Sequence, residues 1–172
     1  GKGSAKITKG SSHNGSLYFY QGFDPILTEK TDFTFSVHVY TGNASLTGEC
    51  KLLAQIYSAG SYVGNATSAP LSSAGEWTKM VLPVTLQAGQ TMTIGLSMTG
   101  AYGTIWVDDI QLEEGEAAGD FNLLENSNFD RDSACWTNGN TPAFNTEYDF
   151  PGREEGQRVI RYYASPTSTQ EY

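Results

Sequence analysis

Two adjacent carboxylates, Asp108 and Asp109, interrupt an apolar run that reads GTIWVDDIQLEEG. Alternation along a strand predicts that Asp108 faces the core and that Asp109 faces outward. Trp106, Ile110 and Leu112 share the predicted core face with Asp108. A carboxylate that faces a core needs a hydrogen-bond partner or a metal ion, because burying an unpaired charge is costly. The pair is therefore a candidate metal-ligating site, with an ordinary hydrogen-bonded acidic pair as the alternative.

Outward-facing aromatic and polar residues form a second candidate set. A sugar ring packs its C–H face on Tyr or Trp, and polar neighbours bond its hydroxyls. If their strands are adjacent, these residues line one surface suited to a sugar. The alternative for any single Tyr is packing at the solvent edge. The set consists of Tyr18, Tyr20, His38, Tyr40, Gln55 and Tyr57.

Constellations typical of catalysis are sparse. The chain has two histidines, His13 and His38, and no G-x-S-x-G motif. The adjacent Glu pairs at 113–114 and 154–155 point their side chains apart in an extended chain, which does not suit a glycosidase pair about 5–9 Å apart. We therefore expect a protein that is not an enzyme.

Composition narrows the class further. The net charge of −9 disfavours nucleic acid as a partner and suits neutral polymers or bound cations. Only 17% of the residues are charged, as in an extracellular all-β module. Cys50 and Cys135 form no C-x-x-C pair, so a zinc site is not expected, and a disulfide or two buried thiols stay open. No apolar run approaches the roughly 18 residues of a membrane span, so no membrane insertion is expected.

Period-two alternation is the dominant pattern along the chain. Gly-, Asn- and Ser-containing clusters, including Thr99–Gly103, separate the alternating runs. Short strands at regular spacing predict a β-sandwich or barrel. Inward positions are predicted for Phe33, Phe35, Val37 and Val39, for Leu52, Ala54 and Ile56, for Met80, Leu82 and Val84, and for Met92, Ile94, Leu96 and Met98.

Four segments carry motifs that belong together: Asn122–Asp130 with Trp136, Gly1–Ile7, Gly75–Met80 and Trp106–Gly115. These motifs resemble those of family 4 and family 9 carbohydrate-binding modules. The resemblance implies a jelly-roll β-sandwich of two antiparallel sheets. It also implies that Trp77 and Trp106 lie in or near the core.

The same resemblance implies a structural calcium ion held jointly by the opening and closing strands. Calcium prefers six to eight oxygen ligands. Asp108, Asp109 and Asp130 would supply the carboxylates.

The motifs occur in rotated order, because those typical of a module's opening strands follow those of its end. Residues 1–118 resemble a module that lacks its opening strands, and residues 119–172 resemble opening strands. The second part packs on the first in permuted order, exchanges with another molecule in a strand-swapped homodimer, or starts a second repeat. Gly3–Thr8 also resembles Gly156–Arg161, so both segments are suited to the same place in a sheet, and the surplus strand is expected at an edge or in a neighbour.

Together these features predict a non-catalytic carbohydrate-binding module of a secreted or cell-surface bacterial protein. A polysaccharide or glycan is the expected partner, and calcium is the expected cofactor. The alternative is a structural spacer or adhesion module in a repeat array that binds no sugar.

Overall fold

The computed structural model describes residues 3–10, 16–42, 46–72, 74–115, 122–125, 127, 135–138, 144–148 and 158–164. The regular elements in these ranges are all β-strands, which confirms the all-β expectation. They are β1 (Gly3–Lys9), β2 (Leu17–Phe23), β3 (Thr31–Tyr40), β4 (Thr47–Ser58), β5 (Ser61–Thr67), β6 (Thr78–Leu86), β7 (Gln90–Glu114), β8 (Thr137–Asn138), β9 (Phe144–Tyr148) and β10 (Arg158–Ala164).

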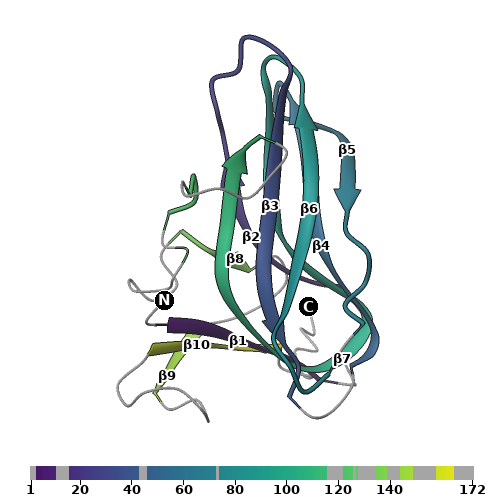
Figure 1. The fold of residues 1–172 in the computed structure, drawn as a ribbon, viewed down its shortest axis with the longest axis vertical. Helices are drawn as coiled ribbons and strands as arrows, with labels where there is room; N and C mark the ends of the chain where they lie inside the picture. The colour runs from purple at the N-terminus through teal and green to yellow at the C-terminus, as the bar shows by residue number, and fades with distance from the viewer. Residues whose placement is uncertain are drawn as a thin grey trace, which may run out of the picture.

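The strands form one strongly curled sheet, a half-barrel, whose two arms are joined by β7. In the first arm, residues 90–102 of β7 pair with β2 and β4, with β8 beyond β2 and β5 beyond β4. In the second arm, residues 103–114 pair with β1 and β3, with β10 and β9 beyond β1 and β6 beyond β3. The pairings are antiparallel except for β1 with β10. Figure 1 shows β3 and β6 in front of β2 and β4. The finer expectation of a two-sheet jelly roll stays a prediction.

β7 runs without a break through Thr99–Gly103, where the sequence predicts a turn. Gly100 and Gly103 have φ angles of 60° and 134°, values that residues with a Cβ rarely adopt. These glycines lie where the strand leaves the first arm and enters the second. The expectation of a turn was therefore wrong, and the glycine cluster marks a change of arm instead.

The hydrophobic core lies inside the curl. The predicted inward positions are buried, with Phe35, Val37 and Ile94 fully so, while Ile56 is half-buried. Burying one such side chain contributes about 1.5–3 kcal/mol. Because the inward residues of both arms belong to one cluster, the outer faces of the arms point away from a shared core.

The two cysteines are free thiols in different surroundings. Cys50 lies in the core, where burial raises the pKa of its thiol to about 12. The thiol is therefore protonated at neutral pH, and it lacks the thiolate needed for nucleophilic chemistry. Cys135 is exposed, and its Sγ donates to Glu125 Oε2 at 3.2 Å. The structure thus has neither the disulfide nor the pair of buried thiols.

The segment after β7 folds back against the same chain. Asn122 Nδ2 donates to the Ile110 carbonyl at 2.7 Å, and Asn122 Oδ1 accepts from the Leu112 amide at 3.1 Å. Trp136 is buried and stacks on Phe19 of β2, with ring centroids 4.8 Å apart. β8 follows directly and pairs with β2. The described part of this segment thereby adds a strand beside β2, while the domain division at residue 118 stays a prediction.

The two similar segments at the ends of the chain are neighbours. β1 pairs with β7 on one side and with β10 on the other, and β9 lies beyond β10. β1 therefore holds the position next to β7, and β10, the surplus strand, extends the same sheet beyond β1.

Candidate functional site

A shallow hollow on the first arm brings together three of the six residues predicted to contact a sugar. Tyr18 and Tyr20 come from β2, and Gln55 comes from β4 across the intervening β7. All three side chains are half-buried, so their positions are fixed while part of each surface stays exposed. We call this the tyrosine hollow; its lining consists of Tyr18, Tyr20, Leu53, Gln55, Thr93, Gly95 and Leu96.

Gly95 shapes the tyrosine hollow. It is the cross-strand partner of both Tyr20 and Leu53, so the residue between those two side chains has no side chain of its own. A Cβ on Gly95 would overlap the backbone of β2, with Tyr20 Cα only 2.7 Å away. Glycine is therefore required here by the close approach of two strands. A lone Gly inside the alternating run Met92–Met98 is the sequence signal that could have located this point.

Two hydroxyl groups hold Gln55. Tyr57 Oη and Thr93 Oγ1 each donate to Gln55 Oε1 at 3.4 Å. The amide nitrogen of Gln55 makes no hydrogen bond to the described residues, so its two N–H groups can donate to a ligand hydroxyl. Tyr57 also meets Tyr62 of β5 edge-on, with ring centroids 6.0 Å apart. Tyr57, a fourth predicted residue, therefore borders the hollow and orients Gln55.

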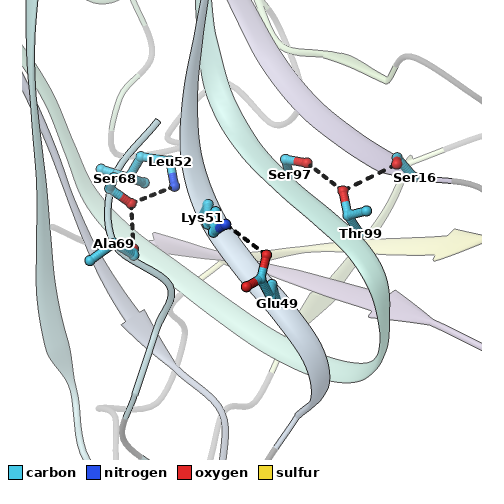
Figure 2. A network of polar contacts seen from close by, with 8 residues as sticks. All are labelled: Ser16, Glu49, Lys51, Leu52, Ser68, Ala69, Ser97 and Thr99. Carbon is cyan, nitrogen blue, oxygen red and sulfur yellow. Dashed lines mark hydrogen bonds and ion pairs between the residues drawn. The ribbon is translucent and has the colours of Figure 1, made fainter. Parts of the chain in front are cut away.

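Polar side chains also lie on the first arm near the tyrosine hollow, and Figure 2 shows the contacts of Ser97 with Thr99 and of Lys51 with Glu49. Ser97 is the cross-strand partner of both Tyr18 and Lys51. Lys51 Nζ lies 2.6 Å from Glu49 Oε2, and the Ser97 hydroxyl shares a hydrogen bond with Thr99. The lining itself contains no charged side chain, and Glu49 balances the charge of Lys51. The surface is thus aromatic, hydroxyl-rich and locally neutral.

The remaining two predicted residues, His38 and Tyr40, lie on the second arm. They belong to β3, which pairs with β6 and with the second half of β7, and not with β2 or β4 in the described sheet. The six residues therefore do not line one surface. Equal alternation in two strands reveals which face a residue occupies but not which strands are neighbours.

Tyr40 belongs to an aromatic row across the second arm. Trp106 of β7 is the cross-strand partner of both Lys6 and Tyr40. The Tyr40 ring centroid lies 5.5 Å from that of Trp106 and 5.5 Å from that of Trp77. Lys6 Nζ lies 5.7 Å from the Trp106 ring centroid, within reach of a cation–π contact. We call Lys6, Trp106, Tyr40 and Trp77 the tryptophan row.

The resemblance implies that Trp77 and Trp106 lie in or near the core, and alternation places Trp106 on the core face, but both lie on the outer side of the sheet. Trp77 is 37% exposed, and Trp106 is half-buried on the outer face. For Trp106 the cause is a β-bulge, where Asp109 and Ile110 together oppose Val37. Asp109 has a φ of 48°, typical of a bulge residue in the left-handed region. The bulge reverses the alternation, so Val107 and Ile110 both face the core although Trp106 faces outward.

The predicted calcium ligands are only partly within the described residues. Asp108 is 2% exposed, and its Oδ1 accepts from the Asp109 amide at 2.8 Å. Asp109 is exposed, with Oδ2 3.6 Å from His38 Nδ1. Asp130 lies outside the described residues. No group of three or more His, Cys, Asp or Glu side chains suited to a metal occurs in the part of the chain that the structure describes, so the calcium site stays a prediction.

Comparisons with known proteins include a distant likeness of fold. Neither a protein-family model nor a curated protein matches the chain. Among solved structures, the C-terminal domain of EclA, a sugar-binding protein, matches with 14% sequence identity and a TM-score of 0.41, over 64% of this chain and 76% of that chain. Within the described ranges, no helix is long and apolar enough to cross a membrane.

Proposed function

We propose that this domain is a non-catalytic module that binds neutral glycans through the tyrosine hollow. The observation that carries the proposal is the meeting of two Tyr rings on β2 with a Gln amide on β4, across the β7 strand between them. Tyr18 and Tyr20 offer ring surface for the C–H face of a sugar, and Gln55 offers donors for its hydroxyls. The resemblance of the sequence motifs to carbohydrate-binding modules supports the same class, with a jelly-roll fold and a place in a secreted or cell-surface protein.

The size of the hollow indicates how a glycan would bind. Its volume is about 10 Å³, close to the space that one water molecule needs. A sugar ring would therefore lie across the surface, with a single substituent entering beside Gly95. Because such contact buries little area, we expect weak affinity, on the order of 0.1–1 mM, or about −4 to −5.5 kcal/mol.

Charge selects the kind of glycan. The chain carries a net charge of −9, and the lining of the hollow offers no cation to offset repulsion of an anionic polymer. A neutral polymer avoids this repulsion and matches the hydroxyl-rich rim. The proposed ligands are therefore uncharged polysaccharides of pyranose sugars.

A glycan array tests the proposal directly. We expect wild-type protein to bind one or more neutral polysaccharides, and Tyr20→Ala to give a clearly weaker signal because a stacking ring is removed. Tyr102→Ala is the matched control, since Tyr102 is an exposed β7 tyrosine that does not line the hollow. Absence of wild-type binding to every neutral glycan on the array would overturn the proposed function.

A further inference from the structure

We infer that the tryptophan row is a second glycan contact, so that one domain holds two separate glycan chains. The inference rests on the proposed function, because it assumes that the protein binds neutral pyranose polymers. It adds a site on the opposite arm with different residues and a different aromatic geometry.

The row is built by four neighbouring segments. Its members follow one cross-strand line from β1 through β7 and β3 to the residue that precedes β6. The Gly75 amide donates to the Gly42 carbonyl, which ties the segment before Trp77 to the end of β3. Trp77 is thereby held beside Tyr40, with an angle of 31° between the two ring planes. A fixed aromatic ring loses little entropy when a ligand stacks on it.

Exposure identifies the ring that a sugar would contact. Trp106 is partly covered, with Lys6 Nζ 5.7 Å from its ring centroid and Tyr40 on its other neighbouring strand. Trp77 ends the row and is 37% exposed. Contiguous exposed apolar patches, rather than single exposed residues, mark binding surfaces, and Trp77 continues the ring contacts of Tyr40 and Trp106. Trp77 is therefore the stacking ring of the second contact, and Tyr40 supports it from the side.

The positions of the tyrosine hollow and the tryptophan row imply that each binds a separate glycan chain. The inner residues of both arms pack in a single core, so the outer faces that carry Tyr20 and Trp77 point away from each other. Figure 1 shows the corresponding strands, β3 and β6 in front and β2 and β4 behind. A short oligosaccharide cannot lie on both faces at once. Two weak contacts of this kind allow the domain to bridge neighbouring polymer chains, with avidity supplied by the second attachment.

Saturation-transfer NMR with soluble oligosaccharides tests the inference, because the method detects weak binding. The probes are cellohexaose, xylohexaose, mannohexaose and laminarihexaose. The proteins are wild type, Tyr20→Ala, Trp77→Ala and the double variant, with Val81→Ala as the control. Val81 is an exposed apolar residue of β6 that is not part of the row. Far-UV circular dichroism checks that each variant is folded.

We expect each single variant to lose roughly half of the saturation transfer to at least one hexasaccharide, the double variant to lose nearly all of it, and Val81→Ala to match wild type. If Tyr20→Ala abolishes the signal and Trp77→Ala has no effect, the second contact is overturned and the proposed function stands. If Trp77→Ala alone abolishes it, the two-site account is overturned in favour of a single site on the second arm. No transfer to any of the four probes with wild type would overturn the proposed function and this inference together.

Discussion

The two outer faces of the curled sheet present aromatic rings in different ways. On the first arm, Tyr20 and Leu53 flank a gap created by Gly95, Tyr18 lies beside it, and the charged residues stay outside the lining. On the second arm, Trp106 and Tyr40 fill a continuous row that has a cation at one end and an exposed ring at the other. The first face therefore offers a recess with hydrogen-bond donors, whereas the second offers a platform.

This difference follows from backbone geometry. The three strands around the tyrosine hollow pair in regular register, and the recess comes from a missing side chain. The tryptophan row exists because the bulge at Asp109 turns Trp106 outward and a glycine-to-glycine hydrogen bond holds Trp77 in place. A recess made by one glycine should be sensitive to adding a single carbon atom there, and a platform made by a bulge should be sensitive to the conformation of one residue.

Gly95→Ala is expected to have the largest effect. The added Cβ would overlap the backbone of β2, so we expect a loss of about 1–3 kcal/mol in the free energy of unfolding, as for overpacked interiors. The affinity of the tyrosine hollow for a glycan should fall together with the stability, because Tyr20 must move. Urea denaturation measures the first effect and glycan titration measures the second.

Gly64→Ala is the matched control for that change. Gly64 lies in the edge strand β5 of the same arm, and a Cβ there would meet no atom within 4 Å. We expect its stability to stay within about 0.5 kcal/mol of wild type. Equal destabilisation by the two substitutions would show that general strand propensity, and not close approach of β2, explains the need for Gly95.

Gln55→Ala should have an intermediate effect, confined to the first arm. Removing the amide deletes its hydrogen bonds to a sugar, and we expect about fivefold to tenfold weaker binding, or about 1–1.4 kcal/mol. Gln87→Ala, in the exposed connection between β6 and β7, should bind like wild type. Unchanged affinity for Gln55→Ala in isothermal titration would contradict the role of Gln55 as the donor.

The regular strand pairing of the first arm and the bulge of the second arm also decide how well each face could be predicted from the sequence. Alternation placed Phe33, Phe35 and Ile94 correctly in the core, because a regular strand exposes every second residue to one side. It also placed Tyr18 and Tyr20 on an outer face, where they line the hollow.

Alternation failed for Trp106. The bulge adds one residue to β7, so the residues before it, including Trp106, face the opposite side from the one that alternation predicts. Trp77 precedes β6, so period two does not apply to its position. The pairing of distant strands was also hidden: Tyr40 and Tyr20 have equivalent local patterns, and only the arrangement of the sheet separates them.

The smallest predicted effect concerns the bulge that forms the second face. Asp109 has a φ of 48°, a conformation that costs residues with a Cβ about 1–2 kcal/mol and glycine little. Asp109→Ala and Asp109→Gly both remove the carboxylate beside His38, so their difference isolates the backbone. We expect Asp109→Gly to be more stable than Asp109→Ala by about 1 kcal/mol. Equal melting temperatures for the two variants would argue against a left-handed bulge residue and against the outward position of Trp106.

The central claim is that the tyrosine hollow binds a neutral glycan. The most direct test is backbone amide chemical-shift mapping, in which the hexasaccharide that gives the strongest saturation transfer is titrated into isotopically labelled protein. We predict concentration-dependent shifts that are largest at Tyr20, Gly95 and Gln55 and their strand neighbours. Absence of shifts at these three amides at saturating hexasaccharide would contradict the account.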